Sequence, residues 1–82
     1  MRYLTLYSRS YCHLCTDMLA ALETLRGEHA FGLAVIDVDS MTDAALLARY
    51  DERVPVLVGA YGELCHYFLD PVAVLAYLRG DG

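Results

Sequence analysis

Residues 3–15 read YLTLYSRSYCHLC, an alternating apolar stretch followed by a polar loop and two cysteines with two residues between them. The alternation over Tyr3–Tyr7 predicts a β-strand, and the polar residues Ser8–Tyr11 predict a turn. From Leu14 to Leu25, apolar residues recur at steps of four, four and three, which is typical of one face of a helix over residues 13–26. The cysteines therefore lie where a strand runs into the first turn of a helix.

The placement of Cys12 and Cys15 favours chemistry over simple packing. A helix N-terminus carries partial positive charge and unpaired backbone N–H groups, so it stabilises a thiolate. Thiols at such positions can have pKa values of roughly 3.5–7.5, against about 8.5 for a free cysteine. The thiolate is the nucleophile of thiol–disulfide exchange. The alternative is an inert pair of core thiols, but a core pair seldom falls at a helix start flanked by polar residues.

The remaining chain predicts a regular succession of short elements. In chain order they are a strand over 31–38, a helix over 44–50, strands over 54–58 and 63–68, and a helix from 71 to 80. Ser10 is placed to cap the first helix, and Ser40–Asp43 has the spacing of a capping box for the second. Gly59–Gly62 supplies the turn of a hairpin. Asp70-Pro71 is an N-cap followed by proline at the first helical position.

This order defines the expected fold class. The first half is a βαβ unit with a parallel strand pair, and the second half closes with a hairpin and a helix. A right-handed crossover places helices over the faces of the sheet. We therefore expect an α/β domain over residues 1–82, with a four-stranded mixed sheet and three helices packed on both of its faces.

Composition and charge restrict the expected size of the core, the location of the protein and its classes of partner. The chain has 82 residues and 57% hydrophobic residues, enough for one modest core. No apolar run approaches the ~20 residues that span a bilayer. The N-terminus has a strand pattern rather than that of a signal peptide, so a cytoplasmic location is expected. The net charge is −5 and all six basic residues are arginine, so no basic stripe favours nucleic acid. We expect the protein to be a monomer. We expect it to bind neither a membrane nor a nucleic acid.

The three cysteines are an odd number, whereas a secreted disulfide scaffold of this size usually has an even one. A close pair in a reducing compartment indicates redox or metal chemistry. A zinc site from Cys12, Cys15, Cys65 and His66 or His13 is the metal alternative. The second half lacks a matching pair of ligands, so no metal site is predicted. Cys65 is interpreted as a structural thiol rather than a third redox centre.

Two motifs, together with the order of strands and helices, resemble those of a known protein family. Tyr11–Cys15 ends a strand–loop segment with a Cys-x-x-Cys at a helix start, and Val54-Pro55 precedes the third strand. In both respects the chain resembles the glutaredoxin branch of the thioredoxin superfamily, and more narrowly a set of short bacterial glutaredoxin-like proteins. The resemblance implies a thioredoxin-like fold and a thiol–disulfide oxidoreductase active in cell redox homeostasis. It also implies a cis Val54–Pro55 bond facing the dithiol.

The resemblance assigns roles to individual residues. Cys12 would be the nucleophile and Cys15 the resolving thiol. The physical expectation agrees, because Cys12 precedes the first helical turn and should be exposed to solvent and substrate. Cys15 lies one turn further in and should be more buried. His13, when protonated, would lower the pKa of Cys12 further. The alternative is that His13 is a solvated residue of the first turn.

A second group of residues is expected to bind the substrate or glutathione. Arg9, three residues before the first cysteine, would hold a carboxylate, unless it is a solvated loop arginine. Tyr11 would shield the thiol and offer an apolar platform. The backbone of Val54, beside Pro55, would pair with an extended substrate.

The chain also departs from the glutaredoxin pattern. His13-Leu14 stands where glutaredoxins commonly have proline and an aromatic residue, and Phe68–Pro71 replaces their Gly-Gly turn. The sequence thus predicts disulfide exchange better than it predicts glutathione as partner. Protein or small-molecule disulfides are the expected partners, glutathione is a candidate co-substrate, and no other cofactor is expected. The alternative function is a thioredoxin-fold module that binds peptides and has a structural or vestigial disulfide.

Overall fold

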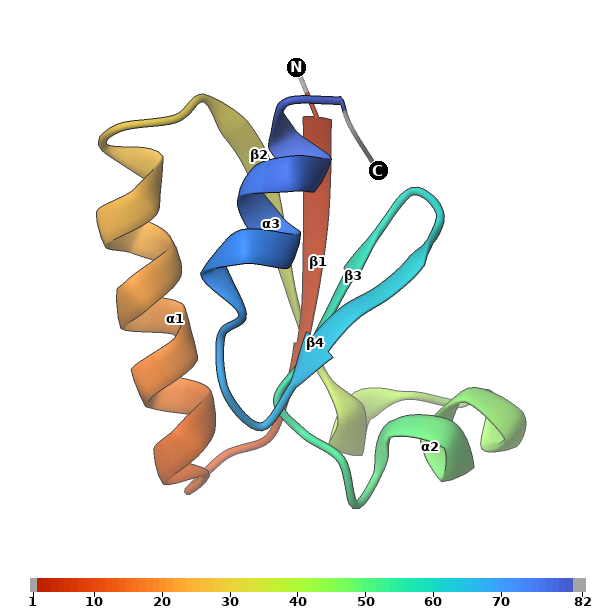
Figure 1. The fold of residues 1–82 in the computed structure, drawn as a ribbon. Coiled ribbons are helices and arrows are strands. Elements are labelled where there is room, and N and C mark those ends of the chain that lie inside the picture. Colours follow the sequence, from red (N-terminus) through yellow and green to blue (C-terminus); the bar gives the residue numbers. More distant parts are fainter. Residues whose placement is uncertain (1, 81–82) are drawn as a thin grey trace.

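The predicted succession of strands and helices is present in the computed structural model, which describes residues 2–80 (Figure 1). The strands are β1 (Arg2–Ser8), β2 (Phe31–Asp37), β3 (Val56–Gly59) and β4 (Gly62–His66). The helices are α1 (His13–Arg26), α2 (Ala44–Tyr50) and α3 (Pro71–Leu78), with a 3₁₀ turn η1 (Val38–Ser40) before α2.

The four strands form one mixed sheet in the order β2-β1-β3-β4. β1 and β2 are parallel, whereas β1–β3 and β3–β4 are antiparallel. The βαβ unit and the hairpin are therefore confirmed. The predicted ends of two strands were wrong. β3 begins after the cis Val54–Pro55 bond, and β4 ends before Tyr67, whose φ of 63° takes the chain out of the extended conformation.

One face of the sheet is covered by α1 and α3, which lie side by side in front of the strands (Figure 1). The main core lies between these layers. Leu4 and Leu6 of β1 and Leu57 of β3 point into it, where Leu22 of α1 and Val74 of α3 meet them. All five side chains are fully buried. Apolar burial of this kind is the main term that stabilises a chain of this size.

The other face has a smaller core under α2. Tyr50 of α2 stacks on Tyr7 of β1 with ring centroids 4.4 Å apart, and Val38 and Val56 are buried beside them. Helices thus pack on both faces, as predicted. α2 lies at the end of the sheet where α1 begins (Figure 1). No helix within residues 2–80 has the length and apolar character that crossing a membrane requires.

The helix caps differ from the predictions in two places. Ser10 does not cap α1; the N-cap is Cys12, because the helix begins directly after it. Ser40 does not cap α2 either, since its hydroxyl donates to the Asp37 carbonyl in η1. Asp43 caps α2, because its carboxylate accepts hydrogen bonds from the backbone N–H groups of Ala45 and Leu46. The predicted cap of α3 by Asp70 is confirmed.

The hydroxyl of Tyr77 in α3 bridges the backbones of β1 and of the β3–β4 turn at the end of the sheet where β1 begins. β1 pairs with β3 only over Thr5–Tyr7, so the start of β1 has no partner strand on that side. The Tyr77 hydroxyl donates to the carbonyl of Tyr3 at 3.0 Å and accepts from the N–H of Ala60 at 2.9 Å. Gly59 allows this approach, because a Cβ there would lie 2.8 Å from the Tyr77 ring.

Replacing Tyr77 by phenylalanine is expected to lower the free energy of unfolding by about 1–3 kcal/mol, because two partly buried backbone groups lose their hydrogen-bond partner. The side chain is only 3% exposed. Tyr3→Phe is the matched control, since the Tyr3 ring is exposed and its hydroxyl has no hydrogen bond within residues 2–80. Urea unfolding of both variants measures the difference, and equal stabilities would refute the bridging role of the hydroxyl.

Candidate active site

Cys12 and Cys15 form a disulfide at the N-terminus of α1, with their Cα atoms 5.2 Å apart. Cys12 is the N-cap residue, and its Sγ accepts a hydrogen bond from the backbone N–H of Cys15 at 3.1 Å. Cys12 is half-buried, whereas Cys15 is only 4% exposed. The expected order of exposure is confirmed: one sulfur lies at the surface and the other beneath it.

The residues on either side of Cys12 face solvent. Tyr11 has a φ of 60° and a fully exposed side chain, so the left-handed turn before the helix directs this ring outward. The exposed imidazole of His13 lies 3.4 Å from the carboxylate of Asp17, one helical turn further on. The structure thus gives His13 a partner other than Cys12, and its effect on the thiol stays a prediction.

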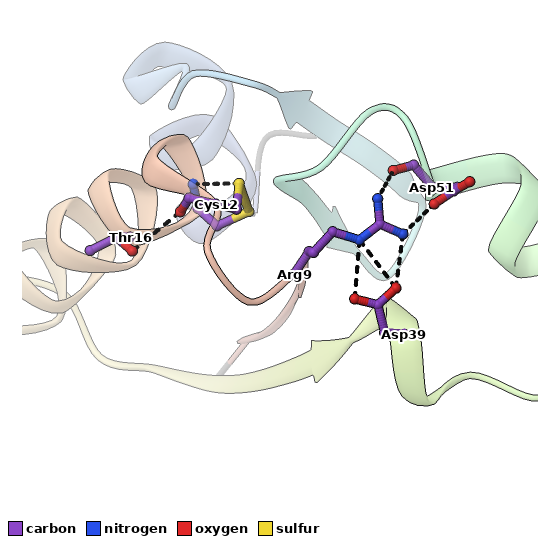
Figure 2. Close-up of a disulfide and its surroundings, with 6 residues drawn as sticks. Arg9, Cys12, Thr16, Asp39 and Asp51 are labelled. Atoms are coloured by element: carbon purple, nitrogen blue, oxygen red, sulfur yellow. Dashed lines mark hydrogen bonds and ion pairs between the residues drawn. A yellow bond between two sulfur atoms is a disulfide. The ribbon is translucent and has the colours of Figure 1, made fainter.

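Arg9 ties the loop that carries Cys12 to two other parts of the molecule (Figure 2). Its Nε and Nη2 donate to the Asp39 carboxylate at 3.0–3.2 Å, and its Nη1 donates to the Asp51 carbonyl at 3.1 Å. Nη2 also pairs with the Asp51 carboxylate. Hydrogen bonds from Arg9 to Asp39 and Asp51 raise its pKa further above the usual value. The guanidinium predicted to hold a substrate carboxylate therefore already contacts two carboxylates of its own chain.

Sequence reasoning missed this three-residue cluster. Arg9 follows β1 and Asp39 follows β2, and the carboxyl ends of neighbouring parallel strands meet at one edge of a sheet. The pairing of Arg9 with Asp39 could therefore have been predicted from the topology. No local pattern indicates Asp51, because its approach depends on how α2 packs on the sheet.

The segment 51–55, which leads into β3, is fixed in place from several sides. The Val54–Pro55 bond is cis, as the resemblance implied, and Pro55 is fully buried. The N–H of Tyr67 donates to the Pro55 carbonyl at 2.9 Å, and its hydroxyl donates to the Glu52 carbonyl at 3.1 Å. Within residues 2–80, no hydrogen bond uses the backbone of Val54.

Arg53, the other arginine of this segment, is also paired within the chain. Its guanidinium donates to Glu63, and the imidazole of His66 lies 2.8 Å from the second oxygen of the same carboxylate. Burial raises the pKa of Glu63, but the hydrogen bonds from His66 and Arg53 outweigh it and hold the pKa below its usual value.

A narrow groove of about 190 Å³ runs between α1 and the loop that joins β4 to α3. Leu14 and Met18 line it from α1, and Phe68 and Leu69 line it from the loop. Phe68 is 69% exposed. This loop, the first turn of α1 and the chain before β3 all lie at the same end of the molecule (Figure 1). The groove therefore adjoins the helical turn that carries the cysteine pair.

Cys65 lies apart from the disulfide in the main core, and burial raises the pKa of its thiol. It is the free cysteine of the chain and has the structural surroundings that the sequence predicted. The candidate zinc ligands are not brought together. In the part of the chain that the structure describes, no three His, Cys, Asp or Glu side chains are arranged to hold a metal ion.

The four-stranded mixed sheet, the cysteine pair at the start of α1 and the cis-proline before β3 define a domain of the thioredoxin-like fold. A family model described as a glutaredoxin-like domain (DUF836) matches residues 3–79. The chain therefore belongs to this glutaredoxin-like family, as the sequence motifs predicted.

Solved structures agree with this assignment. The chain is 44% identical to protein Ne2328 from Nitrosomonas europaea, with a TM-score of 0.80 over 93% of this chain and 89% of that one. It is 36% identical to protein XcR50 from X. campestris, with a TM-score of 0.70 over 94% and 96% of the two chains. A malarial protein at 14% identity and a TM-score of 0.68, over 99% of this chain and 97% of that one, shares the fold. A search of curated proteins finds no match.

Proposed function

We propose that this protein is a thiol–disulfide oxidoreductase in which Cys12 attacks and Cys15 resolves. The observation that carries the proposal is the environment of the two sulfurs. Cys12 lies at the helix N-terminus with its Sγ at 3.1 Å from a backbone N–H, half-buried, above the buried Cys15. A hydrogen bond to sulfur and the positive end of the helix both favour the thiolate over the thiol.

The proposed reaction is an exchange of one disulfide for another. The Cys12 thiolate attacks one sulfur of a substrate disulfide, and the other substrate sulfur leaves as a thiolate that takes up a proton. Cys15, as a thiolate, then attacks Cys12 Sγ, which forms the Cys12–Cys15 disulfide and releases the second substrate thiol. The protein dithiol gives up two electrons and the substrate disulfide gains them. The reverse sequence oxidises a substrate dithiol.

The segment 51–55 supports a way of binding the substrate. An extended chain can add to an exposed backbone and gain main-chain hydrogen bonds, with side-chain pockets supplying selectivity. Val54 has an N–H and a carbonyl without a hydrogen bond within residues 2–80. We assign Val54 and Pro55 to this contact and the exposed Tyr11 ring to the other side of Cys12. We propose the cytoplasm, a reducing compartment, as the setting of this dithiol.

The reactivity of single cysteines tests this proposal. A variant with Cys15→Ser and Cys65→Ala retains Cys12 alone, and one with Cys12→Ser and Cys65→Ala retains Cys15 alone. We expect the alkylation rate of Cys12 to rise with a midpoint clearly below about pH 8.5. The buried Cys15 should react at least about tenfold more slowly, because only the exposed thiolate is attacked. A Cys12 midpoint at or above 8.5 would remove the chemical basis of the proposal.

The midpoint potential of the Cys12–Cys15 couple separates this function from that of a peptide-binding module. Equilibration of the protein with a dithiol buffer measures it. A potential of about −200 mV is expected of a catalytic pair, whereas one below about −300 mV is typical of a structural disulfide.

A further inference from the structure

The surface beside the cysteine pair is apolar on one side. The groove between α1 and the β4–α3 loop is lined by Leu14, the residue directly before Cys15, and by Phe68 and Leu69. The Phe68 ring is largely exposed, and so is that of Tyr11 next to Cys12. A substrate whose sulfur reaches Cys12 therefore lies against large apolar side chains, and an apolar side chain next to the reacting cysteine can fill the groove.

The same surface is acidic around this apolar strip. Asp17, whose side chain is 60% exposed, lines the groove from α1. Asp39 and Asp51 lie on the other side of Cys12, where Figure 2 shows them on either side of Arg9. Asp39 and Asp51 share the guanidinium of Arg9, and Asp17 pairs with the imidazole of His13. The carboxylates therefore outnumber the arginine beside them, and the net local charge is negative. A negative field of this kind attracts cationic partners and repels anionic ones.

Glutathione is poorly matched to this surface. It has two carboxylates and one ammonium group, and it lacks a large apolar side chain. Arg9 is bonded to Asp39 and Asp51, and Arg53 is bonded to Glu63. Arg9 and Arg53 could therefore bind a glutathione carboxylate only if an existing ion pair were broken.

We propose that the substrate of this site is a protein disulfide whose reacting cysteine has a large apolar neighbour and nearby basic residues, rather than a disulfide of glutathione. This inference rests on the proposed function, because it concerns the partner in the same exchange reaction. The apolar neighbour enters the groove beside Phe68, and the basic residues lie near Asp17 and the Asp39–Asp51 pair. Two electrons pass from the Cys12–Cys15 dithiol to the substrate disulfide, as in the reaction above.

A set of matched disulfide peptides tests the inference. Four versions of one peptide disulfide combine leucine or serine next to the cysteine with lysine or glutamate two residues away. The rate constant for oxidation of the reduced protein is measured by stopped flow with each version, with glutathione disulfide and with neutral 2-hydroxyethyl disulfide. We expect the leucine–lysine peptide to react at least about tenfold faster than the serine–glutamate peptide. The lysine preference should shrink in about 1 M salt, where the Debye length falls to ~3 Å.

Substitutions assign the two preferences to their residues. Asp17→Asn should weaken the preference for lysine, and Phe68→Ser should weaken the preference for leucine, each by about threefold or more. The matched controls are Glu28→Gln, which removes one negative charge after the far end of α1, and Tyr61→Ser, which removes an exposed ring in the β3–β4 turn. Both controls should retain the wild-type preferences.

The outcomes separate this inference from the proposed function. Equal rates with all four peptides, or a faster reaction with glutathione disulfide than with the leucine–lysine peptide, would overturn the inference. If 2-hydroxyethyl disulfide still reacts through Cys12 in that case, the proposed function stands. If none of the disulfides oxidises Cys12, both proposals fail.

Discussion

Replacing Cys12 by serine is expected to reduce disulfide exchange to the uncatalysed rate, a loss of at least about a thousandfold, because the hydroxyl cannot take over the role of the nucleophile. Replacing Cys15 by serine should have a different result. The first attack remains possible, but the mixed disulfide at Cys12 has no internal thiol to resolve it. This variant should therefore accumulate one covalently bound substrate per chain, which mass spectrometry under non-reducing conditions detects.

The control for both variants is Cys65→Ala. Cys65 is buried in the main core and lies apart from the disulfide, so its loss should leave the rate of exchange close to that of the wild type. Retained activity in Cys12→Ser, or a stable mixed disulfide formed at Cys65, would contradict the assignment of the nucleophile. Accumulation of the adduct in Cys12→Ser instead of Cys15→Ser would reverse the two roles.

Leu57→Ala is expected to have the largest effect on stability, a loss of about 2–5 kcal/mol in the free energy of unfolding. Leu57 is 0% exposed and occupies a central strand, between its neighbours Leu6 and Cys65. Its side chain faces the core under α1 and α3, so the truncation leaves a cavity that a packed sheet cannot close. Small domains have a total stability of only about 5–15 kcal/mol, so this variant is near the limit of folding.

Urea unfolding followed by far-ultraviolet circular dichroism measures the effect. Val72→Ala is the matched control, because Val72 is 77% exposed at the start of α3 and its truncation should change stability by less than about 0.5 kcal/mol. A loss below about 1 kcal/mol for Leu57→Ala would show that the core closes around the missing atoms, contrary to the packing described.

The parts of the fold that were predictable depend on local patterns. Apolar periodicity along the chain predicts α1, and both α1 and α2 have the predicted bounds, although neither Ser10 nor Ser40 is the N-cap. Asp70-Pro71 likewise marks the start of α3, because an N-cap aspartate and a proline in the first turn act within a few residues. Each of these signals is decided by neighbours along the chain.

One error has a local cause. Ser40 was predicted to cap α2, but its hydroxyl donates to the Asp37 carbonyl three residues earlier, and Asp43 takes the cap position. The other errors arose where distant segments decide the local structure. β4 ends at His66 because Tyr67 turns to bond with the Glu52 and Pro55 carbonyls. The pairing of Arg9 with Asp51 was hidden for the same reason, since Asp51 comes close only once α2 has packed on the sheet. Sequence reasoning located the cysteine pair and missed the ion pairs of Arg9 with Asp39 and Asp51 beside it.

The bonds to segment 51–55 have a consequence for recognition. Arg9 contacts the Asp51 carbonyl, and Tyr67 contacts the carbonyls of Glu52 and Pro55, so residues from two different loops hold one short stretch of backbone. Fixing the backbone of a flexible segment costs roughly 1–2 kcal/mol of conformational entropy per residue. In segment 51–55 the backbone is already fixed in the folded protein, before any partner binds. The extended substrate proposed to bind here would then lose conformational entropy on its own side alone. Differences in affinity between substrates should therefore reflect their own stiffness as much as their contacts.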